Sequence, residues 1–408
     1  MSIRAHALRH LHNAANGAYI YGQDPERMHD LIVKEWAPKL ETNPVIINQL
    51  YNALNVDDKI LETEFLWTTY KNPVGLAAGL LKQPLGLKFW EALWVWYIEV
   101  GSILGEPRQG NAKPRIRRYP HHQTGGLTVV NQMWLPQQWA ELTAAQFQQR
   151  EDDGMMPNIP VWANFTNTPR PGIKLQEQVE DIKISMRYMW DYAKVFVINV
   201  SCPNTGENLQ EQVRELLAPL IQARNELAQE KGESKPMLAK IGPVTSNDKK
   251  RLENYPHLQD NTVDQTKSML DTFVDLGMDG VVATNTAKEH TDLKWLSPMD
   301  DNKNPRWGMS GKNLHERSLE TVAIVKQHTG GSIKIVWLWG IGAGKWPAEW
   351  QQSAGDMLHA WADMVQMYSG VVNNLTSPHF ANKWIASYRK SEQFISRELD
   401  QILRKVKD

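Results

Sequence analysis

The sequence predicts an α/β protein, a (β/α)8 TIM barrel with a small N-terminal helical extension. Three observations lead to this prediction. Eight short apolar runs follow one another along the chain, amphipathic stretches separate many of them, and together they span roughly 300 residues, a length that suits such a barrel. A doubly wound open sheet is the alternative, but the regular repetition of eight units favours a closed barrel.

The composition narrows the class of protein. Of 408 residues, 41% are hydrophobic and 22% are charged, as expected of a globular chain. The 45 basic and 46 acidic side chains nearly cancel, so we expect no nucleic-acid partner. A single cysteine excludes a disulfide framework and a cysteine-built zinc site, and we expect no metal. No apolar run of about 18 residues and no secretory signal pattern are present, so we expect no membrane span.

The N-terminal part reads as helical. Asp24-Pro25-Glu26 is a helix start, with an aspartate at the cap position and a proline in the first turn. The apolar residues that follow, such as Leu31 and Trp36, recur with the period of a helix, and residues 44–54 form a second helical stretch. We interpret residues 1–62 as the extension.

Residues 63–408 are assigned to the barrel and its C-terminal helices. The apolar runs predict strands at 74–78, 97–100, 159–163, 195–200, 237–241, 280–283, 333–338 and 364–367. The amphipathic stretches predict helices at 176–188, 210–229, 264–276, 316–328 and 348–358. In such barrels the active site lies at the C-terminal ends of the strands, which directs attention to the residues after each run.

Amides, hydroxyls and lysines gather at these strand ends. They are Gly79 and Lys82 after the first run, Asn164 after the third, 199–205 after the fourth, Lys240 at the end of the fifth, 284–286 after the sixth and 368–370 after the eighth. Together they predict a pocket for a flat ligand rich in carbonyl and N–H groups. The glycines Gly340, Gly342 and Gly344 after the seventh run leave backbone N–H groups free for a phosphate.

These residues carry a resemblance. The chain resembles the dihydroorotate dehydrogenase family, the FMN-dependent barrel enzymes of pyrimidine synthesis. The matching segments, in family order, are 72–79 (NPVGLAAG), 99–102 (EVGS), 110–115 (GNAKPR), 199–205 (NVSCPNT), 283–286 (ATNT), 309–312 (MSGK) and 365–370 (VQMYSG). They cover about residues 65–390. The N-terminal extension, residues 1–62, resembles that of the quinone-linked class, which implies that it forms a quinone site and touches the membrane surface.

The resemblance implies a role for each matching position. FMN would be held by Ala78, Gly79, Ser102, Asn164, Asn199, Lys240, Thr284, Gly311, Gly340, Tyr368 and Ser369. Dihydroorotate, and its product orotate, would be held by Lys82, Asn131, Asn199, Asn204, Asn285 and Thr286. A base on one side of the substrate and a flavin on the other would take the proton and the hydride. The quinone-linked class further implies a quinone acceptor and a place on the cytoplasmic side of the cell membrane, in peripheral contact with it.

Cys202 matches the catalytic base, and it is one of two departures from the quinone-linked pattern, because that class usually has serine there. A free thiol titrates near ~8.5, so the oxidation rate should rise with pH as Cys202 loses its proton.

Tryptophan is the larger departure: there are 17 Trp, against 11 Tyr and 8 Phe. Twelve of them stand where the family has glycine, namely Trp67, Trp90, Trp94, Trp96, Trp134, Trp139, Trp162, Trp190, Trp307, Trp337, Trp339 and Trp361. Each such change costs on the order of 1–3 kcal/mol, and a dozen would exceed the ~5–15 kcal/mol stability of a domain. Drift would scatter glycine into many residues, so our hypothesis is that the source organism reads UGA codons as glycine.

Three functions stay open at this point. The leading one is oxidation of dihydroorotate by FMN, with a quinone as the electron acceptor. The second is an FMN enzyme acting on another dihydropyrimidine. The third is a degenerate homologue without activity, which follows if the tryptophans are genuine.

Overall fold

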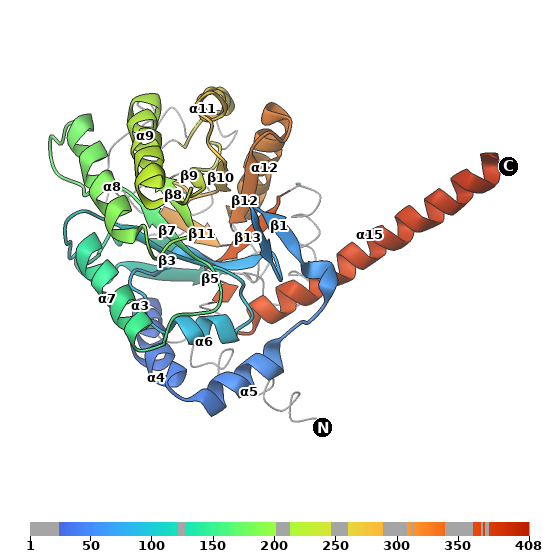
Figure 1. Ribbon diagram of the computed structural model, residues 1–408, viewed down its shortest axis with the longest axis horizontal. Helices are drawn as coiled ribbons and strands as arrows, with labels where there is room; N and C mark the ends of the chain where they lie inside the picture. The colour runs from blue at the N-terminus through green and yellow to red at the C-terminus, as the bar shows by residue number, and fades with distance from the viewer. Residues whose placement is uncertain are drawn as a thin grey trace.

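The structure, a computed structural model, describes residues 24–120, 127–200, 213–245, 260–288, 308–311, 314–338, 362–368, 370–371 and 375–407. Eight parallel strands form a closed barrel, and the helices lie outside it (Figure 1). The strands are β3 (Val74–Leu81), β4 (Ile98–Ile103), β7 (Val161–Phe165), β8 (Val195–Asn199), β9 (Met237–Ile241), β10 (Gly280–Ala283), β12 (Lys334–Leu338) and β13 (Met364–Met367). Each pairs with the next in chain order, and β13 pairs with β3 to close the ring. The predicted fold class and all eight predicted strands are confirmed.

The strands are buried on both faces, which explains why they read as continuous apolar runs. In β8, Val195 and Val197 point into the barrel, whereas Phe196 and Ile198 pack against the outer helices. The outer helices include α6 (Leu87–Ala92), α7 (Ala140–Asp152), α8 (Leu175–Met189), α9 (Val213–Lys231), α11 (Val263–Asp275) and α12 (His315–Thr329). Four of the predicted helices are thus present, and the fifth, at 348–358, lies outside the described residues.

Aromatic rings fill the N-terminal end of the barrel. The short hairpin of β1 (Thr63–Phe65) and β2 (Thr68–Tyr70), which precedes β3, was not predicted from the sequence. Its Phe65 stacks on Trp162, and Trp162 stacks on Tyr97 with ring centroids 4.1 Å apart. Gly75 permits this packing, because a Cβ there would lie 2.3 Å from the Tyr97 ring. Access to the barrel interior is therefore from the opposite, C-terminal end.

A small antiparallel sheet lies apart from the barrel strands and was also not predicted. It consists of β5 (Ile116–Pro120), β6 (Leu127–Asn131) and β11 (Gly308–Gly311), with β6 in the centre. Through Ile116, Val129 and Asn131 it contributes one wall to the cavity described below.

The extension begins at α3 (Pro25–Asp30), where the Asp24 carboxylate accepts hydrogen bonds from the backbone of Glu26 and Arg27, as the sequence predicts. It continues through a π-helical segment (Leu31–Trp36), α4 (Ala37–Glu41) and α5 (Pro44–Leu54). Two buried carboxylates fasten it: Glu26 binds Arg115 of the loop before β5, and Glu41 binds Arg150 of α7 at 2.7 Å. The extension therefore packs firmly on the barrel.

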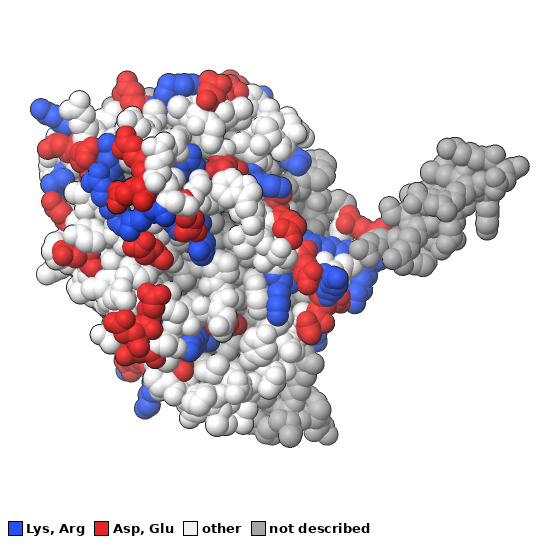
Figure 2. All heavy atoms as spheres, in the orientation of Figure 1, with Lys and Arg blue, Asp and Glu red and all other residues white. Residues whose placement is uncertain are grey.

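The chain ends in the long helix α15 (Ser377–Lys407), which projects away from the barrel (Figure 1). Among the described residues, no helix is long and apolar enough to cross a membrane. Figure 2 shows acidic and basic side chains interspersed over the visible face, in keeping with the balanced charge of the sequence.

Candidate active site

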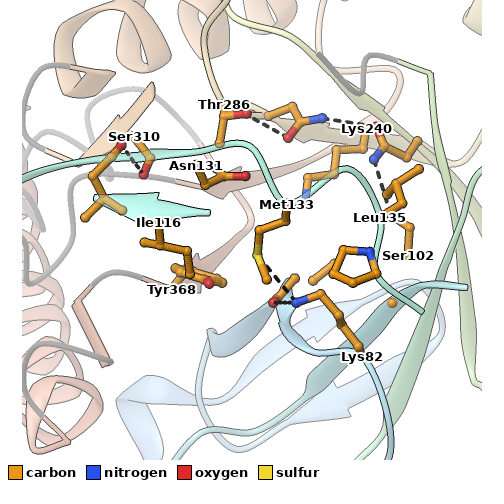
Figure 3. A pocket seen from close by; sticks show the side chains of 17 residues that line it. Lys82, Ser102, Ile116, Asn131, Met133, Leu135, Lys240, Thr286, Ser310 and Tyr368 are labelled. Atoms are coloured by element: carbon orange, nitrogen blue, oxygen red, sulfur yellow. Dashed lines mark hydrogen bonds between the residues drawn. The ribbon is translucent and has the colours of Figure 1, made fainter. Parts of the chain in front are cut away.

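A cavity opens at the C-terminal ends of the barrel strands. Most of the sequence-predicted positions that the structure describes line it: Ala78, Gly79, Lys82, Ser102, Asn131, Asn199, Lys240, Asn285, Thr286 and Tyr368 (Figure 3). They come from six barrel strands and the loops that follow them, and from β6. The topology thus brings together residues that are far apart in the sequence.

The remaining predicted positions fall into two groups. Asn164 and Thr284 are buried beside the cavity rather than in its lining, and Gly311 ends β11. Asn164 reaches the cavity wall through Ser102, whose hydroxyl donates to the Asn164 side-chain oxygen at 2.5 Å. Cys202, Asn204, Gly340 and Ser369 lie outside the described residues.

Side-chain amides form a connected row along one wall. Asn285 donates from its amide nitrogen to the Asn199 side-chain oxygen at 3.1 Å, and Asn199 donates to the Ser102 hydroxyl at 3.4 Å. The backbone N–H of Thr286 donates to the Asn285 side-chain oxygen at 2.8 Å. Because these groups constrain one another, they present an ordered set of donors and acceptors to a ligand.

Two lysines supply positive charge. Lys240 is 3% exposed on β9, beside Asn199 in the strand register. Lys82 follows β3, and its ammonium donates to the Gly79 carbonyl at 3.1 Å. Burial, and then the charges of Arg115 and Lys34, lower the pKa of Lys82 to about 8. Both positions suit a ligand that carries or develops negative charge.

A second cavity lies between the extension and the barrel. His29, Asp30 and Val33 of the extension face Leu80, Arg108 and Arg115 across it, and Lys82, Met133 and Pro136 border both cavities. His29 contacts the Leu80 carbonyl through Nε2 at 3.2 Å, and burial lowers its pKa. The resemblance implies a quinone site in the extension, but the residues that line this cavity were not predicted from the sequence.

Three tryptophans occupy backbone conformations that favour glycine. Of the five described non-glycine residues with positive φ, three are Trp67 (64°), Trp94 (70°) and Trp134 (52°). For a bulky side chain such values are rare and strained. Each of the three stands at a position where glycine was expected from the sequence.

Some of the indole N–H groups at these positions have a hydrogen-bond acceptor and others do not. Trp90, Trp162 and Trp337 donate to Leu85, Tyr70 and Ser318, respectively. The buried indole N–H groups of Trp94, Trp134 and Trp190 find no acceptor within the described part of the chain, whereas buried indoles normally have one. Trp67 is 72% exposed. Trp307, Trp339 and Trp361 lie outside the described residues.

Comparisons with known proteins show which family the chain belongs to. A sequence profile of the dihydroorotate dehydrogenase family matches residues 60–385. The dihydroorotate dehydrogenase (quinone) of Mycobacterium marinum is 30% identical, over 85% of this chain and 85% of its own length. That of Pseudoalteromonas atlantica is 28% identical, over 87% of this chain and 94% of its own.

A solved structure shares the fold. The dihydroorotate dehydrogenase of Eimeria tenella, in complex with ferulenol, superposes with a TM-score of 0.70 at 21% identity, over 92% of this chain and 95% of that one. The profile covers most of the chain, and relatives align along nearly their whole length. The chain therefore belongs to the dihydroorotate dehydrogenase family.

Proposed function

We propose that this protein oxidises dihydroorotate to orotate, with FMN as the bound electron carrier and a quinone as the final acceptor. The observation that carries the proposal is the cavity at the C-terminal end of the barrel. Every described position that the resemblance assigns to the substrate lines it, and so do most of those assigned to the flavin.

The residues present suit a flavin. Gly79 lines the cavity with φ at 94°, a conformation that favours glycine, and a Cβ there would contact the Tyr368 ring at 3.6 Å. Ser102, Asn199 and Lys240 offer a hydroxyl, an amide and an ammonium, which match the carbonyl and nitrogen atoms of an isoalloxazine. When bound, FMN supplies the acceptor for a hydride. Lys240 would stabilise negative charge on the ring, and Gly340 and Ser369 are the proposed phosphate contacts.

The substrate would lie against the amide row. Lys82 is assigned to the substrate carboxylate, because it is the cation after β3 that faces the cavity. Asn131, Asn199 and Asn285 would orient the ring through their amides, with Asn204 as a further contact. Cys202 is the proposed base that removes the proton from the substrate carbon, so its replacement by serine should shift the pH profile of the oxidation step.

The second cavity is the proposed quinone site. It borders the first through Lys82, Met133 and Pro136, so an acceptor bound there would lie close to a flavin in the first cavity. Its lining combines apolar Val33, Leu80 and Leu85 with His29 and Arg115. That mixture suits a ring with an apolar body and two carbonyl oxygens. Peripheral contact of residues 1–62 with a membrane surface belongs to the same proposal.

We also propose that glycine stands at the twelve tryptophan positions in the native enzyme. The positive φ angles at Trp67, Trp94 and Trp134 support this, because they are strained for tryptophan and free of strain for glycine. UGA codons at these positions, with UGG at Trp36, are expected. Mass spectrometry of peptides from the source organism should show glycine at residue 67, and tryptophan there would overturn the proposal.

The test of function is direct. The chain is produced with glycine at the twelve positions, and we expect a yellow protein that converts dihydroorotate to orotate. A colourless protein that does not take up added FMN would contradict the flavin assignment. If the protein is yellow but inactive on dihydroorotate, a screen of other dihydropyrimidines tests the second function.

A further inference from the structure

A buried carboxylate stands beneath the cavity, in the interior of the barrel. Glu99 is fully buried on β4 and has the same inward orientation as Asn164 of β7 and Gln366 of β13. Its outward neighbours Ile98 and Val100 pack against the helices. Glu99 therefore lies between the aromatic residues of the N-terminal end and the polar lining of the cavity.

The hydrogen bonds of Glu99 fix the orientation of two amides. Its Oε1 accepts from the Asn164 Nδ2 at 2.7 Å, and its Oε2 accepts from the Gln366 Nε2. Because the carboxylate oxygens of Glu99 accept, Asn164 turns its nitrogen toward Glu99 and its oxygen toward Ser102. The Ser102 hydroxyl then donates to that oxygen and accepts from the Asn199 amide.

The same direction continues to the far end of the row. Asn199 accepts from Asn285, and Asn285 accepts from the backbone N–H of Thr286, which only donates. One end of the row is thus an obligatory acceptor, Glu99, and the other an obligatory donor. These fixed ends favour one arrangement of the amides, although side-chain amides have similar shapes in both orientations.

We propose that Glu99 is a positioning residue: it sets the direction of the hydrogen-bond row from Asn164 to Asn285 and thereby the donors and acceptors that the cavity presents. It reaches the lining through Asn164. The proposal rests on the function above insofar as FMN and orotate are the ligands used to test it.

The first variant is Glu99→Gln, in the chain with glycine at the twelve positions. Glutamine has to present its NH2 group to one of two amides that already donate, so either Asn164 or Gln366 turns over. If Gln366 turns, the row keeps its direction, so the variant that tests the role is Glu99→Met. It offers Asn164 no acceptor, so Asn164 can turn its nitrogen toward Ser102 and the row loses its direction. We expect the dissociation constant for FMN or for orotate to rise about tenfold, measured by flavin fluorescence and by the spectral shift on adding orotate.

The decisive variant is the double exchange Glu99→Gln with Gln366→Glu. Here the introduced glutamine on β4 donates to the new carboxylate on β13 and accepts from Asn164, so the row regains its direction while the charge moves. We expect both dissociation constants to return to within about threefold of the parent, because no hydrogen bond is lost. If Glu99 mattered only because its charge lies on β4, moving the charge to β13 would not restore the binding of either ligand.

The outcomes separate the two proposals. If the parent chain binds neither FMN nor orotate, the proposed function fails. If the parent binds both ligands and Glu99→Met, which offers Asn164 no acceptor, binds them equally well, the positioning role is overturned. If Glu99→Met does not fold, the double exchange decides: binding near the parent level supports the role, and loss of folding or of binding overturns it.

Discussion

The imidazole of His29 lies nearly parallel to the phenol ring of Tyr368, with centroids 6.5 Å apart and planes 17° from each other. His29 belongs to the N-terminal extension and Tyr368 follows the last barrel strand. His29 lines the second cavity and Tyr368 lines the first. The pair therefore stands at the boundary between the proposed electron donor and acceptor sites.

Replacement of His29 should separate the two half-reactions. In His29→Leu we expect quinone reduction to fall at least about tenfold, since the polar contact in the second cavity is lost. Reduction of a soluble dye by dihydroorotate should stay within about twofold, because His29 does not line the first cavity. Steady-state rates with the two acceptors provide the measurement. His328→Leu on α12 is the matched control, and equal loss with both acceptors would contradict the quinone site.

Lys82 should make ligand binding depend on pH. With a pKa of about 8 it is mostly protonated at pH 7, and it loses its charge as the pH rises through 8. Orotate affinity should therefore fall between pH 7 and 9, as calorimetric titration can measure. Lys82→Arg stays charged, so its affinity should change little over this range. A falling affinity in both proteins would assign the effect to another group.

Lys82 should also make the free energy of unfolding depend on pH. The folded-state pKa of Lys82 is below the unfolded value of 10.5, so the unfolded chain binds more protons between these pH values. The cost of burying the ammonium is present in full below pH 8 and disappears as the pH rises toward 10.5. The Lys82 contribution to the free energy of unfolding should thus become more favourable with pH. Urea denaturation of the parent and of Lys82→Met at pH 7 and pH 9.5 measures this contribution. If the two proteins differ in their free energy of unfolding by the same amount at both pH values, the prediction is contradicted.

Glu26 should matter more to stability than an exposed carboxylate. It is 2% exposed and accepts from the Arg115 Nε at 2.7 Å and from the Arg115 backbone N–H at 2.9 Å. Glu26→Ala leaves the buried guanidinium unpaired and should lower the free energy of unfolding by about 3 kcal/mol. Glu106→Ala breaks the exposed pair with Arg170 and should cost less than about 1 kcal/mol. Similar losses in the two variants would contradict the anchoring role of Glu26.

The strain at Trp67 can be measured by comparing alanine with glycine. Both substitutions remove the indole, so the difference in stability between the two variants reports the strain of the backbone conformation. With φ at 64°, glycine should be more stable than alanine by about 1 kcal/mol. At Trp36, with φ at −72° in a helix, alanine should be better by about the same amount. Thermal unfolding of the four variants tests this, and the same preference at both positions would refute it.

The barrel strands were predictable because each is buried on both faces and reads as an uninterrupted apolar run. The hairpin β1–β2 and the sheet of β5, β6 and β11 were missed. Their strands have three to five residues, and Gly308 pairs with Asn131 from a distant part of the chain. Pairing of this kind leaves no local signal.

The first cavity was largely predictable, since residues after the strands of one barrel converge at the same end. For the second cavity, the resemblance implied a quinone site in the extension but none of its residues. Those depend on how the extension packs, and His29 looks like any other polar residue on a helix. Glu99 carried a signal that went unused: a glutamate within an apolar run, where a charge needs partners from other strands.

The barrel closes where β13 pairs with β3, and Tyr368, which stands at the boundary of the two cavities, directly follows β13. During synthesis β3 is made first and its partner last, so until Met364–Met367 emerge the ring has an open edge. Neither binding site is complete before that moment. We therefore expect a prematurely terminated chain to lack a complete flavin site and to have no partial activity. It would also expose an unpaired strand edge, which promotes aggregation and degradation.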